Sequence, residues 1–416
     1  MNILGLIVEY NPFHNGHLYH LQQSIKKTTP DLIIAIMSGD FLQRGEPALV
    51  NKWSRTNMAL RAGVDLVVEL PYLYAVQKAD IFAEGAVSRL VELGVTDICF
   101  GSEEGDISSF FDTFSWMNNR QSLIDEQLKN EMSKGKSYPK AFSDAVATLQ
   151  PPDTVLDLSK PNNILGYQYV KSSFNQRTSI RMHTIKRSGS EYNDRHLSHA
   201  SIASATALRH MLIKDKRPID FLKPYVPSYA LEQLSTYFSI FNKFHTWDDY
   251  FPFIQHSLIS QDNCSLNQIY ECEEGLENRL RKAIITSVGF DDFISKIKAK
   301  RYTRTRLQRL LVHLYLKTNK WFVKKHLGEQ HPAYIRVLGM SDKGQHHLSK
   351  LKKQTTLSIL TTASKSQHPV FQKDILASRL HGLPNHRTGM SFMEEYQTVP
   401  LRYHINSDTF ITDRRP

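Results

Sequence analysis

The chain has 416 residues, of which 41% are hydrophobic and 22% charged, and its formal net charge is +11. This composition is typical of a globular protein with a large core, and the length suffices for two domains. The first apolar run lacks a preceding basic segment and stops at Glu9, which excludes a secretory signal and a membrane span there.

The first hundred residues alternate between short apolar runs and segments whose apolar residues have helical spacing. We expect strands at 3–8, 31–37, 65–70 and 97–100, and helices at 15–27, 52–62 and 79–93. The strands are apolar without polar alternation, as a parallel sheet covered on both faces requires. The pattern predicts a Rossmann-like, doubly wound α/β domain with a parallel sheet.

The rest of the chain divides near a proline-rich segment. Residues 107–180 are expected to form helices and loops, 179–187 a further strand, and a helix beginning near Ser201 closes the first domain. Three prolines in 214–229 favour a boundary there, which gives a first domain at 1–215 and a second domain at 216–416. Helical spacing, as in "RLQRLLVHLYL", predicts that the second domain is mostly helical.

Ligands of such sheets bind at the carboxyl ends of the strands, which directs attention to the loop "EYNPFHNGH". Pro12 stiffens this turn, and Gly16 allows the backbone to approach a ligand closely. A helix beginning near Asn15 presents free N–H groups to the same place, and His14 and His17 add hydrogen-bond donors without a permanent charge. The loop therefore predicts a phosphate site.

Two other interpretations of these histidines remain open. His14 and His17 could bind zinc with Glu9 or a distant residue as third ligand, although no such ligand stands at a recognisable spacing. They could also cap the helix and face solvent, and His20, one turn further on, is the weakest candidate of the three. The cysteines, Cys99, Cys264 and Cys272, form neither a disulfide framework nor a thiolate zinc motif, which fits a reducing cytoplasm.

The turn at Tyr10–His17 resembles the first signature of the nucleotidylyltransferase superfamily, of the HxGH type, in which both histidines contact ATP phosphates. The second signature of that superfamily has a counterpart in "IASATALR". There Ser204, Thr206 and Arg209 fall on the matching places. Hydroxyl groups and an arginine at a helix start can clamp the β- and γ-phosphates.

Further segments resemble the bacterial tRNA(Met) cytidine acetate ligase family, namely "MSGDFLQRGEPALVNKWSRTNMALRAGVDLVVELP", "FGSE", "KPNNILGYQY", "RSGSEYND", "KRYTRTRLQRLLVHLYL" and "YIRVLGMSDKGQ". The resemblance spans nearly the whole chain. It implies ATP contacts by Ile7, Val8, Glu9, Tyr10, Asn11, Pro12, Phe13, His14, Asn15, Gly16, His17, Leu18, Tyr19, His20, Gly101, Asn162 and Arg187.

The family resemblance also implies the reaction. Acetate attacks the α-phosphate of ATP to give acetyl-adenylate, and N4 of the wobble cytidine of elongator tRNA(Met) then takes the acetyl group. His14 and His17 are the expected catalytic residues, since they stabilise charge on the triphosphate. Mg²⁺ is the expected companion of ATP, but no acidic cluster identifies its ligands.

The loop "SGDFLQRGEP" offers further candidates. Asp40 and Glu46 could deprotonate N4, although a hydrogen-bonding role within the loop is favoured for each. Arg44 could hold the acetate carboxylate.

The second half carries an excess of positive charge. The segment from Lys296 to Lys353 contains about sixteen Lys and Arg residues and two acidic residues. We expect the tRNA-binding residues near the start of one helix, with Tyr302 or Trp321 stacking on an unpaired base, while the alternative is a solvated helix face. The expected tRNA-binding residues are Lys298, Lys300, Arg301, Arg304 and Arg306.

Two other functions are compatible with parts of the sequence. A small-molecule nucleotidylyltransferase that adenylates a phosphorylated metabolite would carry the same ATP signatures. A non-enzymatic RNA-binding protein with a degenerate nucleotide domain is disfavoured by the intact His14, His17 and Arg209. The sequence does not indicate an oligomeric state.

Overall fold

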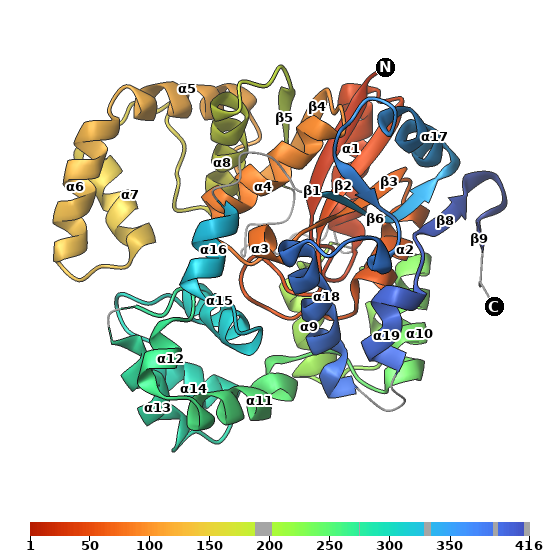
Figure 1. Ribbon diagram of the computed structural model, residues 1–416. Helices are drawn as coiled ribbons and strands as arrows, with labels where there is room; N and C mark the ends of the chain where they lie inside the picture. Colours follow the sequence, from red (N-terminus) through yellow and green to blue (C-terminus); the bar gives the residue numbers. More distant parts are fainter. Residues whose placement is uncertain (188–201, 274, 328–333, 386–389, 412–416) are drawn as a thin grey trace.

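A computed structural model describes residues 1–187, 202–273, 275–327, 334–385 and 390–411. Within these ranges a nine-stranded sheet runs through the molecule with helices on both faces (Figure 1). The strand order is β5-β4-β1-β2-β3-β6-β8-β9, and β7 also pairs with β6. The strands are β1 (Ile3–Val8), β2 (Leu32–Ser38), β3 (Leu66–Leu70), β4 (Asp97–Ser102), β5 (Arg181–Lys186), β6 (Tyr334–Ser341), β7 (Ser358–Leu360), β8 (Leu401–His404) and β9 (Thr409–Ile411).

The first half matches the predicted alternation closely. Strands β1 to β5 are mutually parallel, and the expected helices begin at the predicted residues and end within one residue of them. They are α1 (Asn15–Thr28), α2 (Lys52–Arg61) and α4 (Ala79–Glu92). The single turn α3 (Tyr72–Ala75) was not predicted, and the helix expected near Ser201 is α9 (Ala205–Ile213). The segment 188–201, including most of "RSGSEYND", lies outside the described residues.

The sheet does not end at the predicted boundary. Strand β6 pairs antiparallel with β3, and β7, β8 and β9 extend the sheet beyond it, so residues 216–416 complete a mixed sheet. All eight residues of β6 are buried. The run YIRVLGMS contains Arg336 and Ser341 but shows no regular alternation of polar and apolar residues. A short buried run of this kind cannot be distinguished from a buried helical segment by its periodicity, which explains why the sequence did not reveal the strand.

The remaining helices fall into three groups (Figure 1). An arm of α5 (Ile107–Asn118), α6 (Gln121–Ser133) and α7 (Tyr138–Thr148) leads into α8 (Pro161–Asn175). A helical lobe contains α11 (Trp247–Ser260), α12 (Asn263–Asn267), α13 (Leu276–Ile284), α14 (Phe290–Ile297), α15 (Arg304–Tyr315) and α16 (Lys320–Leu327). Helices α10 (Ser228–Phe241), α17 (Asp342–Leu351), α18 (Pro369–Gly382) and α19 (Met390–Gln397) pack around the sheet.

No helix among the described residues combines the length and the apolarity needed to span a bilayer. The helical lobe instead has its own core, in which Phe293, Leu307 and Leu311 are fully buried. Phe41 and Tyr72 from the first half belong to the same core. The lobe is therefore joined to the loops that follow β2 and β3.

A tight hairpin at residues 41–47 makes the closest of these junctions. Phe41 pairs with Pro47, and the N–H of Leu42 donates to the carbonyl of Glu46 at 2.9 Å. Gly45 has a φ of +72° and faces α15, where an added Cβ would lie 2.2 Å from the backbone nitrogen of Arg309. The hairpin can press against α15 because this residue lacks a side chain.

The substitution Gly45→Ala should lower the free energy of unfolding by about 3 kcal/mol, through left-handed backbone strain and overpacking against α15. The matched control is Gly94→Ala, which has a φ of +73° but no atom within 4 Å of the added Cβ. It should lose only about 1 kcal/mol. Urea unfolding of both variants measures the difference, and equal losses would contradict the close contact with α15.

Candidate active site

The turn between β1 and α1 places two imidazole rings against the start of the helix. His14 caps α1, and its Nδ1 accepts a hydrogen bond from the N–H of Gly16 at 3.0 Å. The Nδ1 of His17 accepts from the N–H of His14 at 3.3 Å. The two ring centroids are 3.8 Å apart, at 31° to each other. The histidines thus replace the usual Ser and Glu of a capping box.

These hydrogen bonds determine what the rings can offer a ligand. Because Nδ1 accepts in both neutral rings, the proton lies on Nε2, which becomes a donor. Burial lowers the pKa of His14 to about 4, helped by the positive charges of Arg187 and Arg209. Burial and the neighbouring His14 hold the pKa of His17 well below its usual range. Both side chains are neutral donors at pH 7.

Aromatic side chains of the same turn pack against the ring of His17. The ring of Tyr10 lies 5.0 Å from that of His17, and the ring of Phe13 lies 5.7 Å from it. Tyr10 and Phe13 belong to the core, together with the buried Pro12. Of the expected ATP stretch, these residues therefore position the loop, whereas Tyr19 is exposed on α1.

His20 lies closer to this cluster than its spacing suggested. Burial lowers the pKa of His20 to about 4, and its Nε2 is buried without a hydrogen-bond partner among the described residues. A Cβ added at Gly101 would lie 3.7 Å from the ring of His20 and 3.4 Å from the side chain of Arg187. The end of β4 thus approaches both residues, as expected if Gly101 borders the site.

The second signature lies beside the first. Ser204 caps α9 by accepting from the N–H of Ala207 at 3.2 Å. Arg209 donates to the carbonyl of Asn11 at 2.9 Å and to the carboxylate of Glu46 at 3.0 Å, and its guanidinium lies 3.4 Å from the hydroxyl of Thr206. The arginine therefore links α9 to the turn after β1 and to the hairpin after β2.

Asn162 is held at the other side of the site by a residue that the sequence did not single out. The carboxylate of Glu103 accepts from the side chain of Asn162 at 2.7 Å and from the N–H of Asn163 at 2.8 Å. The Oδ1 of Asn163 in turn accepts hydrogen bonds from the backbone N–H groups of Glu103 and Glu104, both at 3.1 Å. The pairing of the loop after β4 with α8 is a contact between distant parts of the chain.

The zinc interpretation finds little support. Glu9 accepts from the N–H of Gln43 at 2.8 Å, and burial raises its pKa, so its carboxylate is engaged by the hairpin. Among the described residues, no group of three or more His, Cys, Asp or Glu side chains could hold a metal ion. The solvent-facing interpretation fails as well, because His14 is buried.

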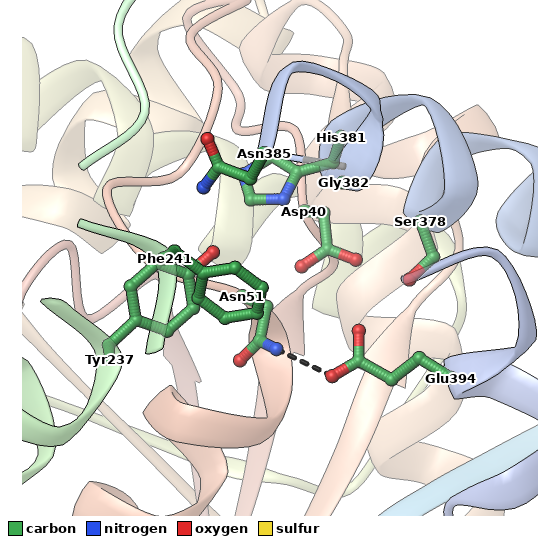
Figure 2. Close-up of a pocket in the computed structure, with 9 residues that line it drawn as sticks. All are labelled: Asp40, Asn51, Tyr237, Phe241, Ser378, His381, Gly382, Asn385 and Glu394. Carbon is green, nitrogen blue, oxygen red and sulfur yellow. Dashed lines mark hydrogen bonds between the residues drawn. The ribbon is translucent and has the colours of Figure 1, made fainter. Parts of the chain in front are cut away.

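Asp40 lies away from the histidines, in the separate pocket of Figure 2. Its carboxylate accepts from the N–H of Lys52 at 2.7 Å, so the favoured hydrogen-bonding role is correct. Glu394 faces the same pocket, and burial raises its pKa to about 8. Glu46 is likewise a loop partner, since it binds Arg209.

The predicted basic residues are distributed differently from the expectation. Lys298 and Lys300 lie in the exposed turn between α14 and α15, and only Arg304 and Arg306 are on the helix. These two arginines pair with Asp291 at 2.7 Å and with Glu273 at 3.1 Å.

The structure separates the two aromatic candidates for base stacking. Tyr302 is only 7% exposed and its ring is covered by Arg306, so it cannot stack on a base. Trp321 is 65% exposed and is open to contact.

Known proteins share this architecture over the full chain. The HIGH Nucleotidyl Transferase family matches residues 1–395. The tRNA(Met) cytidine acetate ligase of Bacillus subtilis (strain 168) is 43% identical over 416 residues, which cover 99% of this chain and all of the relative. That of Bacillus licheniformis is 43% identical over 415 residues, again 99% of this chain and all of the relative.

Two crystal structures of Thermotoga maritima TmcAL are similar to this fold. The form bound with alpha-thio ATP has a TM-score of 0.85 at 32% identity, and the apo form has 0.86 at 34%. Each comparison covers 97% of this chain and all of the other.

The lowered pKa of His20 predicts a pH effect on stability. In the unfolded chain His20 binds a proton below about pH 6.5, whereas in the folded protein the buried side chain stays neutral down to about pH 4. The free energy of unfolding therefore falls as the pH is lowered across this window. His20→Gln should reduce the fall between pH 7 and pH 5 by about 1 to 2 kcal/mol. Urea unfolding at both pH values measures it. The exposed His256→Gln is the control, and identical curves for His20→Gln and the parent protein would refute the assignment.

Proposed function

The chain belongs to the HIGH Nucleotidyl Transferase family and, within it, to the tRNA(Met) cytidine acetate ligases, and we propose that it uses ATP to join acetate to N4 of the wobble cytidine of elongator tRNA(Met). The observation that carries this proposal is the pair of neutral imidazole donors at the start of α1, with Arg187 and Arg209 nearby. Donors and a helix N-terminus at one place suit a triphosphate.

The first step needs stabilisation of charge rather than a base. The carboxylate of acetate is ionised at pH 7, so its oxygen can attack the α-phosphorus directly while the bond to the bridging oxygen of pyrophosphate breaks. We assign His14 and His17 to the phosphate oxygens where charge develops. Arg209, with Ser204 and Thr206 beside it, is assigned to the departing pyrophosphate.

The other expected ATP contacts surround this centre. Gly101 is the next-to-last residue of β4 and Arg187 directly follows β5, so both lie at the carboxyl end of the sheet. Asn162, in the first turn of α8, is held there by Glu103, which directly follows β4. Arg187 also shares the electrostatic environment of His14 and His20. We propose that these residues border the bound nucleotide.

Mg²⁺ has no ready-made site in the described part of the chain. The ion is therefore proposed only as the companion of the ATP phosphates, which hold Mg²⁺ with water ligands in many nucleotide enzymes.

In the second step the N4 amine attacks the acetyl carbonyl, a C–N bond forms and AMP leaves with the electrons of the broken C–O bond, while N4 releases one proton to the solvent. The RNA must splay its base out of the anticodon stack to reach the cleft. We propose that residues 1–215 provide the ATP site and that residues 216–416 bind tRNA, chiefly through Lys298, Lys300, Arg301, Arg304 and Arg306. Similarity over the basic half as well as the ATP signatures favours RNA over a phosphorylated metabolite as acceptor.

A tRNA substrate and three cysteines that are all free thiols suit a reducing compartment, and we propose a cytoplasmic location.

His17→Ala should lower acetate-dependent exchange of pyrophosphate into ATP on the order of 10²-fold or more, since one well-placed donor contributes about 3 kcal/mol to a transition state. The affinity for tRNA should stay within twofold, because the RNA surface is elsewhere. His256→Ala, an exposed histidine of the lobe, is the matched control. Exchange by the parent protein that ignores acetate but responds to a phosphorylated metabolite would overturn the proposal, as would failure to form N4-acetylcytidine in tRNA(Met).

Replacing Arg301, Arg304 and Arg306 together by Gln should affect tRNA binding rather than pyrophosphate exchange, in contrast to His17→Ala. Exchange without RNA should be retained, while tRNA binding weakens and its dependence on salt becomes shallower, because fewer phosphates are neutralised. Filter binding across a salt series measures both. The control replaces Lys350, Lys352 and Lys353 by Gln. These lysines are exposed around the end of α17, and their replacement removes the same amount of charge. Equal effects of the two triple variants would show that net charge alone matters.

A further inference from the structure

The hairpin at residues 41–47 joins the ATP site to the helical lobe. On one side, Glu46 binds Arg209 and the N–H of Gln43 donates to Glu9. On the other, Phe41 packs among aromatic rings of the lobe, 6.0 Å from Tyr250 and 6.3 Å from Tyr315 between ring centroids. Each side of the hairpin is thus fixed by buried or hydrogen-bonded contacts.

Arg44 lies at the turn of this hairpin and differs from the neighbouring arginines. Arg209 pairs with Glu46, Arg306 with Glu273 and Arg309 with Glu271. Arg44 is exposed, and its guanidinium forms no hydrogen bond or ion pair with any residue that the structure describes. The cationic side chain of Arg44 is therefore accessible to a ligand beside the candidate ATP site.

The position of Arg44 is set by its neighbours. Gly45 presses on the backbone of Gln308 and Arg309 in α15. Arg306, one of the basic residues proposed for RNA binding, is three residues earlier on that helix, about 4.5 Å along its axis. On the other side, the charge of Arg44 acts on Glu9 and on Arg187, so the guanidinium also lies near the ATP site.

We propose that Arg44 binds a backbone phosphate of the RNA next to the reacting cytidine and so guides this nucleotide from α15 into the ATP site. This inference rests on the proposed function. An exposed guanidinium suits a phosphodiester that passes over the surface, to which it can donate two parallel hydrogen bonds. Acetate, by contrast, would need an enclosed pocket to be selected over larger carboxylates, and Arg44 is not enclosed.

The test compares Arg44→Gln and Arg44→Lys in two assays. Pyrophosphate exchange with ATP and acetate, without RNA, should stay within twofold of the parent enzyme. Formation of N4-acetylcytidine should show a KM for tRNA raised on the order of tenfold in Arg44→Gln, the loss of one charge-assisted hydrogen bond. Arg44→Lys should recover part of it, since the charge remains and the paired geometry is lost. Arg177→Gln is the charge-matched control, because this exposed arginine precedes β5 and so lies at the amino end of that strand, opposite to the carboxyl ends where the candidate site is.

The outcomes separate this inference from the function on which it rests. A KM for acetate that rises in the exchange assay would place the acetate carboxylate at Arg44 and overturn the assignment to RNA. Unchanged values in both assays would likewise overturn it, while leaving the ligase function intact. The proposed function itself would be contradicted by the parent enzyme, if it showed no acetate-dependent exchange or formed no N4-acetylcytidine in tRNA(Met).

Discussion

The buried ammonium group of Lys52 holds the two halves of the chain together. It lies 2.8 Å from Glu69 on β3 and 2.9 Å from Glu395 on α19, and all three side chains are almost completely buried. Burial alone would lower the pKa of Lys52, but the carboxylates of Glu395 and Glu69 raise it well above its usual range, so the group stays charged. Removing one partner would leave an uncompensated charge in the interior, which typically costs about 3 to 5 kcal/mol. Glu395 in the second half of the chain is therefore needed to stabilise the buried charge of Lys52 in the first half.

Helix α2, which begins at Lys52, connects this buried ion pair to the candidate active site. Lys52 is the first residue of α2, and its N–H binds Asp40. One turn later the buried guanidinium of Arg55 donates to the carbonyls of Glu9 and Ser38 at 2.8 and 3.0 Å. Glu9 directly follows β1 and Ser38 is the last residue of β2, so α2 fixes the loops that present His14, His17 and the hairpin. Donors held by the fold need no reorganisation when charge develops on a phosphate, and this is the usual physical basis of such catalysis.

The parts of the site that the sequence revealed are those written in consecutive residues. His14, Gly16 and His17 lie within one turn, and the apolar runs of β1 to β4 alternate along the chain with helical segments, so both could be recognised without a structure. The contacts of Glu103 with Asn162 and of Glu46 with Arg209 join residues 59 and 163 positions apart, and no local pattern encodes them. The burial of Tyr302 depends in the same way on how the lobe folds over it. Strand β6 was missed because its partner, β3, is more than 260 residues away.

The continuous sheet restricts how the RNA can meet the adenylate. Strand β6 lies between β3 and β8, and Arg336 on β6 also reaches Glu395. A hinge near residue 215 would have to break this ladder and expose the buried charges, which is far costlier than rotating two domains joined by a polar interface. The basic turn before α15 and the histidines of α1 are therefore held at a fixed separation. In the complex that we propose, the RNA supplies the movement, by extending a single nucleotide from its loop across the hairpin to the cleft.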